Sequence, residues 1–199
     1  MQFIDKKLSM PSDVAQWVKK NKPTEWNLSQ DYREGYEILR EQLREEQYGL
    51  CCYCGQILEE VATIEHLHSR NKHSKLTFDY QNLLLSCQVS KQCDNAKGNQ
   101  VLDLTPLMPE CDDEIRLNWA GELIAKTDRA KQAITLLNLN GRKLCGQRQT
   151  FLLEMMATLD LAEEDMLAFI KDEKNSSILF EFFEKAEYHR MQYHLKKLQ

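Results

Sequence analysis

The chain has 199 residues and a formal net charge of −5, and 42% of its residues are hydrophobic and 29% charged. Seven glycines and four prolines are too few for a collagen-like, low-complexity or disordered chain. The sequence contains no run of about eighteen apolar residues, which a membrane span would need. Its first seven residues lack the apolar core of a signal peptide. We therefore expect a cytoplasmic protein of one compact body without membrane contact, and its acidic balance argues against indiscriminate binding to polyanions.

Helical periodicity dominates the first quarter of the chain. Ser12 precedes apolar residues at helical spacing, which predicts a short helix capped by Ser12. A second, amphipathic helix is predicted over 29–47, because its apolar residues are spaced three or four apart. These apolar residues are Tyr32, Tyr36, Leu39 and Leu43. We interpret residues 1–48 as an N-terminal helical segment whose apolar faces pack into the core.

The periodicity breaks in the next segment, residues 49–105. Short β-prone runs at 62–64 and 83–85 are interrupted by cysteines, histidines and a basic loop over 69–75. Residues 66–100 carry five basic and two acidic side chains, whereas the segments before and after them each have a net charge of −4. The positive charge of the chain is therefore concentrated in its cysteine-rich part.

Five of the seven cysteines fall between positions 51 and 93. In a reducing compartment this clustering favours metal binding over disulfides. Cys51 and Cys54 have the spacing of a knuckle that aims two thiolates at one ion, and Cys87 and Cys93 can complete a tetrahedral site. Cys52 is too close to Cys54 to be a second ligand. We predict a structural Zn²⁺, because four thiolates leave no open position for water.

Beyond residue 105 the sequence predicts a small hairpin turning at Gly121, followed by helices. Asp160, with Glu163 three residues later, resembles a capping box and predicts that a helix begins there. The other predicted helices cover residues 129–137, 143–159 and about 176–197. We expect residues 106–199 to form one compact unit with the preceding segment. The fold class is therefore α+β, with a small β core in a mostly helical body.

Three further motifs lie between and after the cysteine pairs: Glu65-His66, Asn82-Leu83 and the segment from Asp94 to Gly98. In this order they resemble the HNH nucleases, in which paired cysteines, an acidic residue followed by His, an Asn-Leu dipeptide and a second cysteine pair lead into a helix. The resemblance implies a ββα-metal fold, treble-clef-like and stabilised by zinc, over residues 49–105.

The flanking residues resemble a subgroup, the PtuB-like nucleases of Septu- and retron-associated anti-phage systems. Trp26 matches a leading Trp, residues 49–54 match a Gly-Leu-Cys-x-Tyr-Cys knuckle, and residues 130–140 match an Ala-x-x-x-Ile-x-x-Leu-Asn-Leu-Asn stretch. The resemblance implies a role in defence against phage with an ATPase of the PtuA type as partner. The acidic flanks independently suggest that the chain relies on a partner to capture nucleic acid.

Phosphodiester hydrolysis needs a positioned water, a base and positive charge on the phosphate oxygens. His66 is the expected base, because neutral imidazole is available near pH 7. Asn82 would orient that imidazole or hold the local backbone. Glu65 and Asp94 would bind a catalytic Mg²⁺ or Mn²⁺, although Asp94 departs from the Asn or His of the family. Asn95 is the alternative ligand, because the long gap between the second pair of cysteines can shift the start of the helix.

Contacts to the nucleic-acid substrate, DNA or RNA, are expected from basic side chains. Lys97 lies one helical turn after Cys93 and would meet a phosphate. Arg70, Lys72 and Lys75 of the basic loop and His68 are the other candidates. The competing hypothesis is a non-catalytic zinc adaptor for protein or nucleic acid, because zinc folds of this kind serve many purposes. Such an adaptor would be indifferent to Mg²⁺ or Mn²⁺ and to Glu65→Ala.

Overall fold

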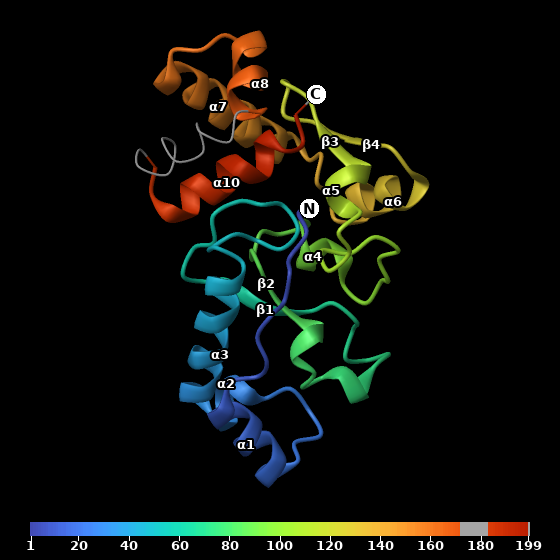
Figure 1. Ribbon diagram of the computed structural model, residues 1–199. Helices are drawn as coiled ribbons and strands as arrows, with labels where there is room; N and C mark the ends of the chain where they lie inside the picture. Colours follow the sequence, from blue (N-terminus) through green and yellow to red (C-terminus); the bar gives the residue numbers. More distant parts are fainter. Residues whose placement is uncertain (172–182, 199) are drawn as a thin grey trace.

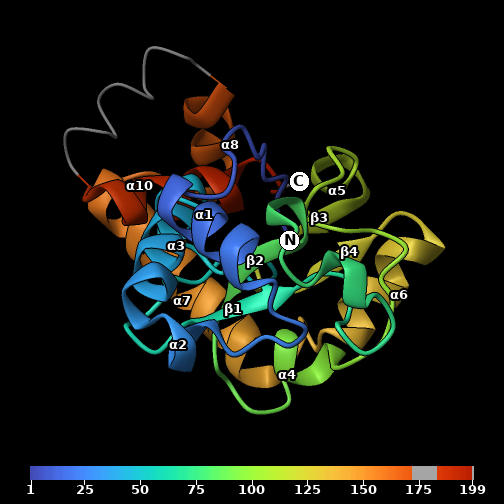
Figure 2. The same cartoon turned by 90° about the horizontal axis from the view of Figure 1, so that it is seen from below.

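The computed structural model describes residues 1–171 and 183–198 and has a mixed α+β fold, as the sequence predicts. Its strands form two small antiparallel sheets. The sheet of β1 and β2 lies in the middle of the molecule, between the N-terminal helices and the C-terminal helices (Figures 1 and 2). Within the described residues no helix is both long and apolar enough to cross a membrane.

The N-terminal segment contains α1 (Ser12–Asn21), α2 (Leu28–Asp31) and α3 (Arg33–Glu46). The single helix expected over 29–47 is interrupted at Tyr32, whose φ of −150° and ψ of 74° are not helical. A Cβ atom at Gly35 would lie 2.3 Å from the Tyr32 ring, so the missing side chain lets this ring pack against α3. The expected Ser12 cap is also wrong, because the N-cap of α1 is Pro11 and makes no side-chain cap bond.

The central hairpin consists of β1 (Thr63–His66) and β2 (Leu83–Ser86), paired from Thr63 opposite Ser86 to His66 opposite Leu83. All residues of β2 are buried, and α3 packs against this strand. Gln47, just after α3, exchanges two hydrogen bonds with the Leu85 backbone, at 2.7 and 3.0 Å. At Leu85 the open edge of β2 is therefore bonded by this side chain, together with the Cys52 N–H, instead of by a third strand.

The connection between the strands includes two short 3₁₀ helices, η1 (Ser74–Leu76) and η2 (Tyr80–Asn82). After β2 the chain passes Cys87 and Cys93 and forms the single helical turn α4 (Asp94–Lys97). Cys93 has a φ of +54°, a left-handed conformation that is uncommon for a side chain larger than glycine.

The C-terminal part begins with α5 (Cys111–Glu114) and the predicted hairpin of β3 (Ile115–Leu117) and β4 (Leu123–Ala125). It continues with α6 (Asp128–Leu136), α7 (Arg142–Leu159), α8 (Glu163–Lys171) and α10 (Lys185–Leu195). Asp160 does not begin a helix, contrary to expectation: it ends α7 in the left-handed conformation, and α8 begins at Glu163. The first part of the helix expected over 176–197 lies outside the described residues.

The buried hydrophobic residues form one continuous cluster that runs from the N-terminal segment through the central hairpin to α10. The cluster includes Leu39 of α3, Leu84 of β2, Leu152 of α7 and Met191 of α10, each at most 1% exposed. Because all parts share this core, the central hairpin is held from both ends of the molecule.

Candidate metal centre and adjoining polar pocket

Four cysteine sulfurs converge on one point, and they belong to the four residues expected from the sequence. The Sγ atoms of Cys51, Cys54, Cys87 and Cys93 all lie within 4.8 Å of one another. The Cys51 and Cys93 sulfurs are 3.8 Å apart, and those of Cys54 and Cys87 are 3.9 Å apart. Zn–S bonds of about 2.3 Å in a tetrahedron place the sulfurs about 3.8 Å apart. The cluster therefore fits a zinc ion.

The first two cysteines are placed by a tight knuckle. The Gly55 N–H donates to the Cys51 carbonyl at 3.1 Å, and Gly55 has a φ of +68°, which glycine adopts without strain. The Cys52 N–H donates to the Leu85 carbonyl at 3.0 Å and attaches the knuckle to β2. Burial raises the pKa of Cys52 well above its usual value, so this thiol stays protonated beside the cluster.

The second pair comes from the end of β2 and the start of α4. The Cys93 N–H donates to the Leu137 carbonyl at 3.0 Å, which anchors this cysteine to the C-terminal part. Burial by itself raises the pKa of the Cys51 thiol, but hydrogen bonds from the neighbouring cysteines lower it well below its usual value. The Cys87 N–H also points at the Cys51 sulfur, at 3.4 Å. This backbone N–H thus stabilises a thiolate at Cys51.

A polar pocket of about 200 Å³ opens beside β1 and α4. It brings together Glu65, His66 and Asp94, the three residues that the sequence assigns to catalysis, and Arg70 of the basic loop. Asn95 is exposed and does not line the pocket, so of the two alternative ligands only Asp94 reaches it. The other lining residues are Ile64, Ser69, Asn71, Gly98 and Asn99.

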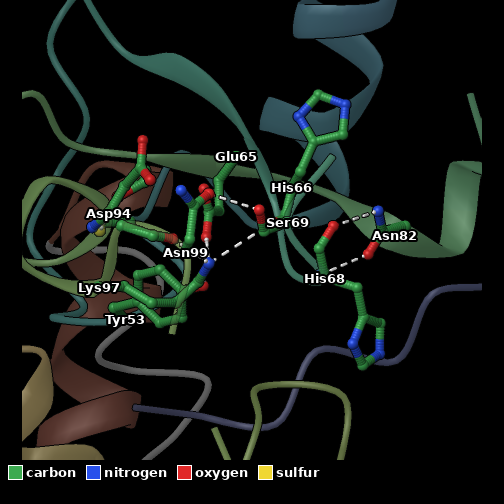
Figure 3. Close-up of polar contacts among 12 residues, drawn as sticks. Tyr53, Glu65, His66, His68, Ser69, Asn82, Asp94, Lys97 and Asn99 are labelled. Carbon is green, nitrogen blue, oxygen red and sulfur yellow. Dashed lines mark hydrogen bonds and ion pairs between the residues drawn. The ribbon is translucent and has the colours of Figure 1, made fainter. Parts of the chain in front are cut away.

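Glu65 is 4% exposed and has two polar partners (Figure 3). Its Oε1 atom accepts a hydrogen bond from the Tyr53 hydroxyl at 2.7 Å and lies 2.8 Å from the Lys97 ammonium. Burial and the neighbouring Asp94 carboxyl, only partly opposed by the Lys97 charge, raise the pKa of Glu65 to about 8. A cation in the pocket would favour the ionised carboxylate in the same way as Lys97 does.

Lys97 does not face the solvent, and the expected phosphate contact is therefore wrong. Its side chain is 1% exposed, and besides the Glu65 ion pair its ammonium donates to the carbonyls of His66 and Gly98, both at 3.3 Å. The turn of α4 directs this side chain back under β1 (Figure 3). The role of Lys97 is thus to neutralise Glu65 and to attach α4 to the hairpin.

His66 follows Glu65 in β1, and successive side chains of a strand point to opposite faces. Figure 3 accordingly shows its ring directed away from Glu65 and Asp94. The Nε2 atom lies 3.0 Å from the Thr77 carbonyl, and the ring packs edge-on against Trp26 with centroids 4.6 Å apart. Burial lowers the pKa of His66 to about 4, so the ring is neutral at pH 7. With a hydrogen on Nε2 donated to Thr77, Nδ1 remains a proton acceptor.

Asn82 holds the loop that follows β1 and does not contact the His66 ring. Its Oδ1 accepts from the His68 N–H at 2.7 Å, and its Nδ2 donates to the carbonyls of His68 and Leu76 at 3.1 and 3.0 Å. Of the two roles left open by the sequence, the structure shows the one that fixes the backbone.

The remaining expected substrate contacts lie outside the pocket. Lys72 and Lys75 are exposed in the loop, and the ring of His68 lies 5.2 Å from that of His73. Sequence reasoning missed Ser69 and Asn99, which line the pocket and are joined by a hydrogen bond from the Ser69 hydroxyl to Asn99 Oδ1. A polar residue directly after Lys97-Gly98 was the available signal for Asn99.

No protein-family model and no curated protein matches this chain. The fold and the site themselves define an α+β protein with a four-cysteine cluster that can hold zinc. Next to it lies a pocket lined by Glu65, Asp94, Arg70 and His66, whose ring is turned away from the two carboxylates. Two carboxylates with room for water suit a hard divalent cation, and a neutral imidazole can take a proton from water.

Proposed function

We propose that the protein is a metal-dependent endonuclease of the HNH type that hydrolyses phosphodiester bonds in nucleic acid. The observation that supports this most is the shared pocket of Glu65, His66 and Asp94. The order of the elements gives further support, because a β-hairpin followed by α4 is the ββα arrangement that the sequence resemblance implies. The four cysteines join the knuckle, β2 and α4, so a zinc ion would stabilise this arrangement.

In this proposal each residue of the pocket has a distinct task. Glu65 and Asp94 would hold a Mg²⁺ or Mn²⁺ ion, which when bound stabilises negative charge on the phosphate and the leaving oxygen. His66 accepts the proton of the attacking water at Nδ1, while the Thr77 carbonyl fixes the ring through Nε2. Arg70 lies on the same pocket and neutralises a non-bridging phosphate oxygen. Asn82 keeps the loop that carries Arg70 in place.

The proposed setting is the cytoplasm, where the chain acts in anti-phage defence with an ATPase of the PtuA type. Support comes from the resemblance around Trp26 and the cysteine knuckle and from the net charge of −5, which disfavours unaided capture of a polyanion. Co-expression with a neighbouring ATPase tests this part. We expect a stable complex that cleaves nucleic acid faster than the isolated chain, and a chain that stays alone and cuts efficiently contradicts it.

The experiment that tests the nuclease itself compares His66→Ala with wild-type protein on plasmid, phage DNA and total tRNA. We expect cleavage that requires Mg²⁺ or Mn²⁺ and that falls at least about 100-fold in His66→Ala, because loss of a general base costs about 10²–10⁴-fold. Zinc content and circular dichroism should be unchanged. His73→Ala is the matched control, because His73 is exposed and does not line the pocket. Full cleavage by His66→Ala removes this residue from the mechanism.

A non-catalytic zinc adaptor is the second candidate, and two features of the pocket favour it. Glu65 is already neutralised by Lys97, and the ring of His66 is buried and turned away from the carboxylates. An adaptor would bind nucleic acid or protein equally with and without Mg²⁺ and would be unaffected by Glu65→Ala. If the wild-type protein cleaves nucleic acid and Glu65→Ala does not, the protein is a nuclease and not an adaptor.

A further inference from the structure

A second pocket, of about 310 Å³, lies between the loop that follows the cysteine knuckle and the helices α7 and α10. It shares no lining residue with the pocket of Glu65. The lining residues of the loop and of the chain after β2 are Gln56, Ile57, Glu59, Val61, Ala62, Cys87, Gln88, Val89 and Gln92. Lys143 and Gln147 come from α7 and Arg190 from α10. A neighbouring pocket of about 420 Å³ shares Gln56, Gln147 and Arg190 with it and is also lined by Phe151. We call the first of these pockets the knuckle groove.

One wall of the knuckle groove is aliphatic and exposed. Ile57, Val61 and Val89 line it and are 39%, 64% and 37% exposed. Branched aliphatic side chains that converge on one hollow leave apolar surface in water, which a bound apolar group would remove at a gain of about 25 cal/mol per Å². Clustering of this kind marks interaction surfaces more often than scattered exposed residues do.

The residues that line the groove also include hydrogen-bond donors that the described residues do not use. Gln56 Nε2 and Arg190 Nε are both buried atoms without an acceptor among the described residues. The Arg190 guanidinium lies over the Phe151 ring, 4.1 Å from its centroid, so it is held in place. Lys143 adds a second positive charge, and among the described residues Glu59 is the only acidic one in the lining. The groove therefore suits a ligand with an aliphatic part and a nearby anionic acceptor.

We propose that the knuckle groove binds an extended peptide segment of a partner protein, in which an aliphatic side chain lies next to an Asp or Glu. The aliphatic side chain packs on Val61 and Val89, and the carboxylate meets Arg190 and Lys143. Nucleic acid fits less well, because bases stack on aromatic side chains and none of the described residues that line the groove is aromatic. The amide groups of Gln56, Gln88, Gln92 and Gln147 can serve a peptide backbone, which presents both donors and acceptors.

The test is a selection of displayed random 12-residue peptides on the zinc-loaded full chain, followed by affinity measurements with the enriched peptides. Val61→Asp and Lys143→Glu change two exposed residues of the groove. Val61→Asp places a charge on the surface where the aliphatic side chain packs, and Lys143→Glu places a negative charge where the carboxylate binds. We expect peptides that combine aliphatic and acidic residues, with at least ten-fold weaker binding to both variants. Val101→Asp is the matched control, because Val101 is 48% exposed and lies outside the lining. It should bind like wild-type protein.

Two outcomes overturn the proposal. One is a selection that yields no peptide sensitive to Val61→Asp, or only peptides without acidic residues. The other is a 12-nucleotide oligo-dT that binds wild-type protein and loses affinity in Val61→Asp and Lys143→Glu but not in Val101→Asp, which assigns the surface to nucleic acid. Neither outcome depends on the activity of the Glu65 pocket, so the two proposals can fail separately.

Discussion

Glu65 and Lys97 place two opposite charges 2.8 Å apart, each on a side chain that is at most 5% exposed. Removing charges from water is costly, and their mutual attraction offsets this cost only while both are present. Tyr53 adds a hydrogen bond to the same carboxylate oxygen. The pair therefore ties α4 to β1 and the cysteine knuckle, and it keeps a carboxylate in the polar pocket.

Lys97→Met should lower the free energy of unfolding by about 3–5 kcal/mol, because the buried Glu65 carboxyl must then either stay ionised without a counterion or bind a proton. Urea unfolding of the zinc-loaded protein measures this change. The double variant Lys97→Met with Glu65→Gln should recover part of the loss, because the unpaired charge is then gone. Lys75→Met, at an exposed loop position, is the control. A loss in Lys97→Met no larger than in this control contradicts the argument.

The candidate residues could be found from the sequence, but their partners could not. The spacing from Cys93 shows that Lys97 comes one turn later, yet which way that turn faces depends on its contact with Glu65, more than thirty residues earlier in the chain. For Asn82 the sequence left two roles open, and the conformation of the loop from His68 to Leu76 decided between them. Such contacts join distant parts of the chain, and local pattern carries no information about them.

At the scale of elements, the parts around the metal centre are too short to be stable alone. β1, β2 and α4 have four residues each. An isolated two-stranded hairpin is marginal in water, and so is a single helical turn. The four cysteines join the knuckle, the end of β2 and the start of α4. A bound zinc ion therefore supplies a cross-link where these elements cannot bury enough surface of their own.

Cys93→Ser should prevent zinc binding and unfold the central hairpin. The binding free energy of a structural zinc ion is about 10–16 kcal/mol near pH 7, comparable to the whole stability of a typical domain. Metal analysis should give one zinc per chain for wild-type protein and less for the variant, and amide exchange in β2 should become fast. Cys145→Ala is the control, because Cys145 lies outside the cluster and should keep both the zinc and the slow exchange. Slow exchange in zinc-free Cys93→Ser contradicts the prediction.

Periodicity predicted the presence of most elements but not all of their boundaries. The helical spacing after Arg129 and Lys143 corresponds to α6 and α7, and the glycine turn corresponds to the hairpin of β3 and β4. The break between α2 and α3 was missed, because it depends on how the Tyr32 ring packs on Gly35. Asp160 was assigned to the wrong helix, because an Asp can cap a start or adopt the left-handed conformation at an end.

At the scale of the whole molecule, the last described residues pack against residues 111–117, near the middle of the sequence. Lys197 is fully buried, and its ammonium donates to the Cys111 carbonyl at 3.0 Å and to Asp112 at 3.1 Å. The Leu117 N–H donates to the Lys197 carbonyl at 2.8 Å, next to a bridge between Leu117 and Leu198. These contacts hold α10 onto the C-terminal hairpin and place Arg190 in the knuckle groove.

His194 of α10 is fully buried, and neither of its ring nitrogens has a partner among the described residues. Its ring lies 5.6 Å from the Phe151 ring and 4.7 Å from the Tyr193 ring, measured between centroids. Burial is the main cause that lowers the pKa of His194 well below its usual value. Nearby positive charges act in the same direction: Arg190, Arg148, the Met1 amino group and Lys197. His194 is therefore neutral in the folded protein over a range of pH in which an exposed histidine is charged.

This burial predicts a loss of stability in mild acid. Below pH of about 6.5 the unfolded chain binds a proton at His194 and the folded protein does not, so the free energy of unfolding falls as the pH falls, by about 1.4 kcal/mol per unit. Other groups titrate in the same range, including His66, so the effect is isolated by comparing variants. Between pH 7.5 and 5.5, the stability of His194→Leu relative to wild-type protein should rise by about 1.4 kcal/mol in urea unfolding. The exposed control His73→Leu should show no such rise, and parallel curves for wild-type protein and His194→Leu would mean that the folded protein accepts the proton at His194.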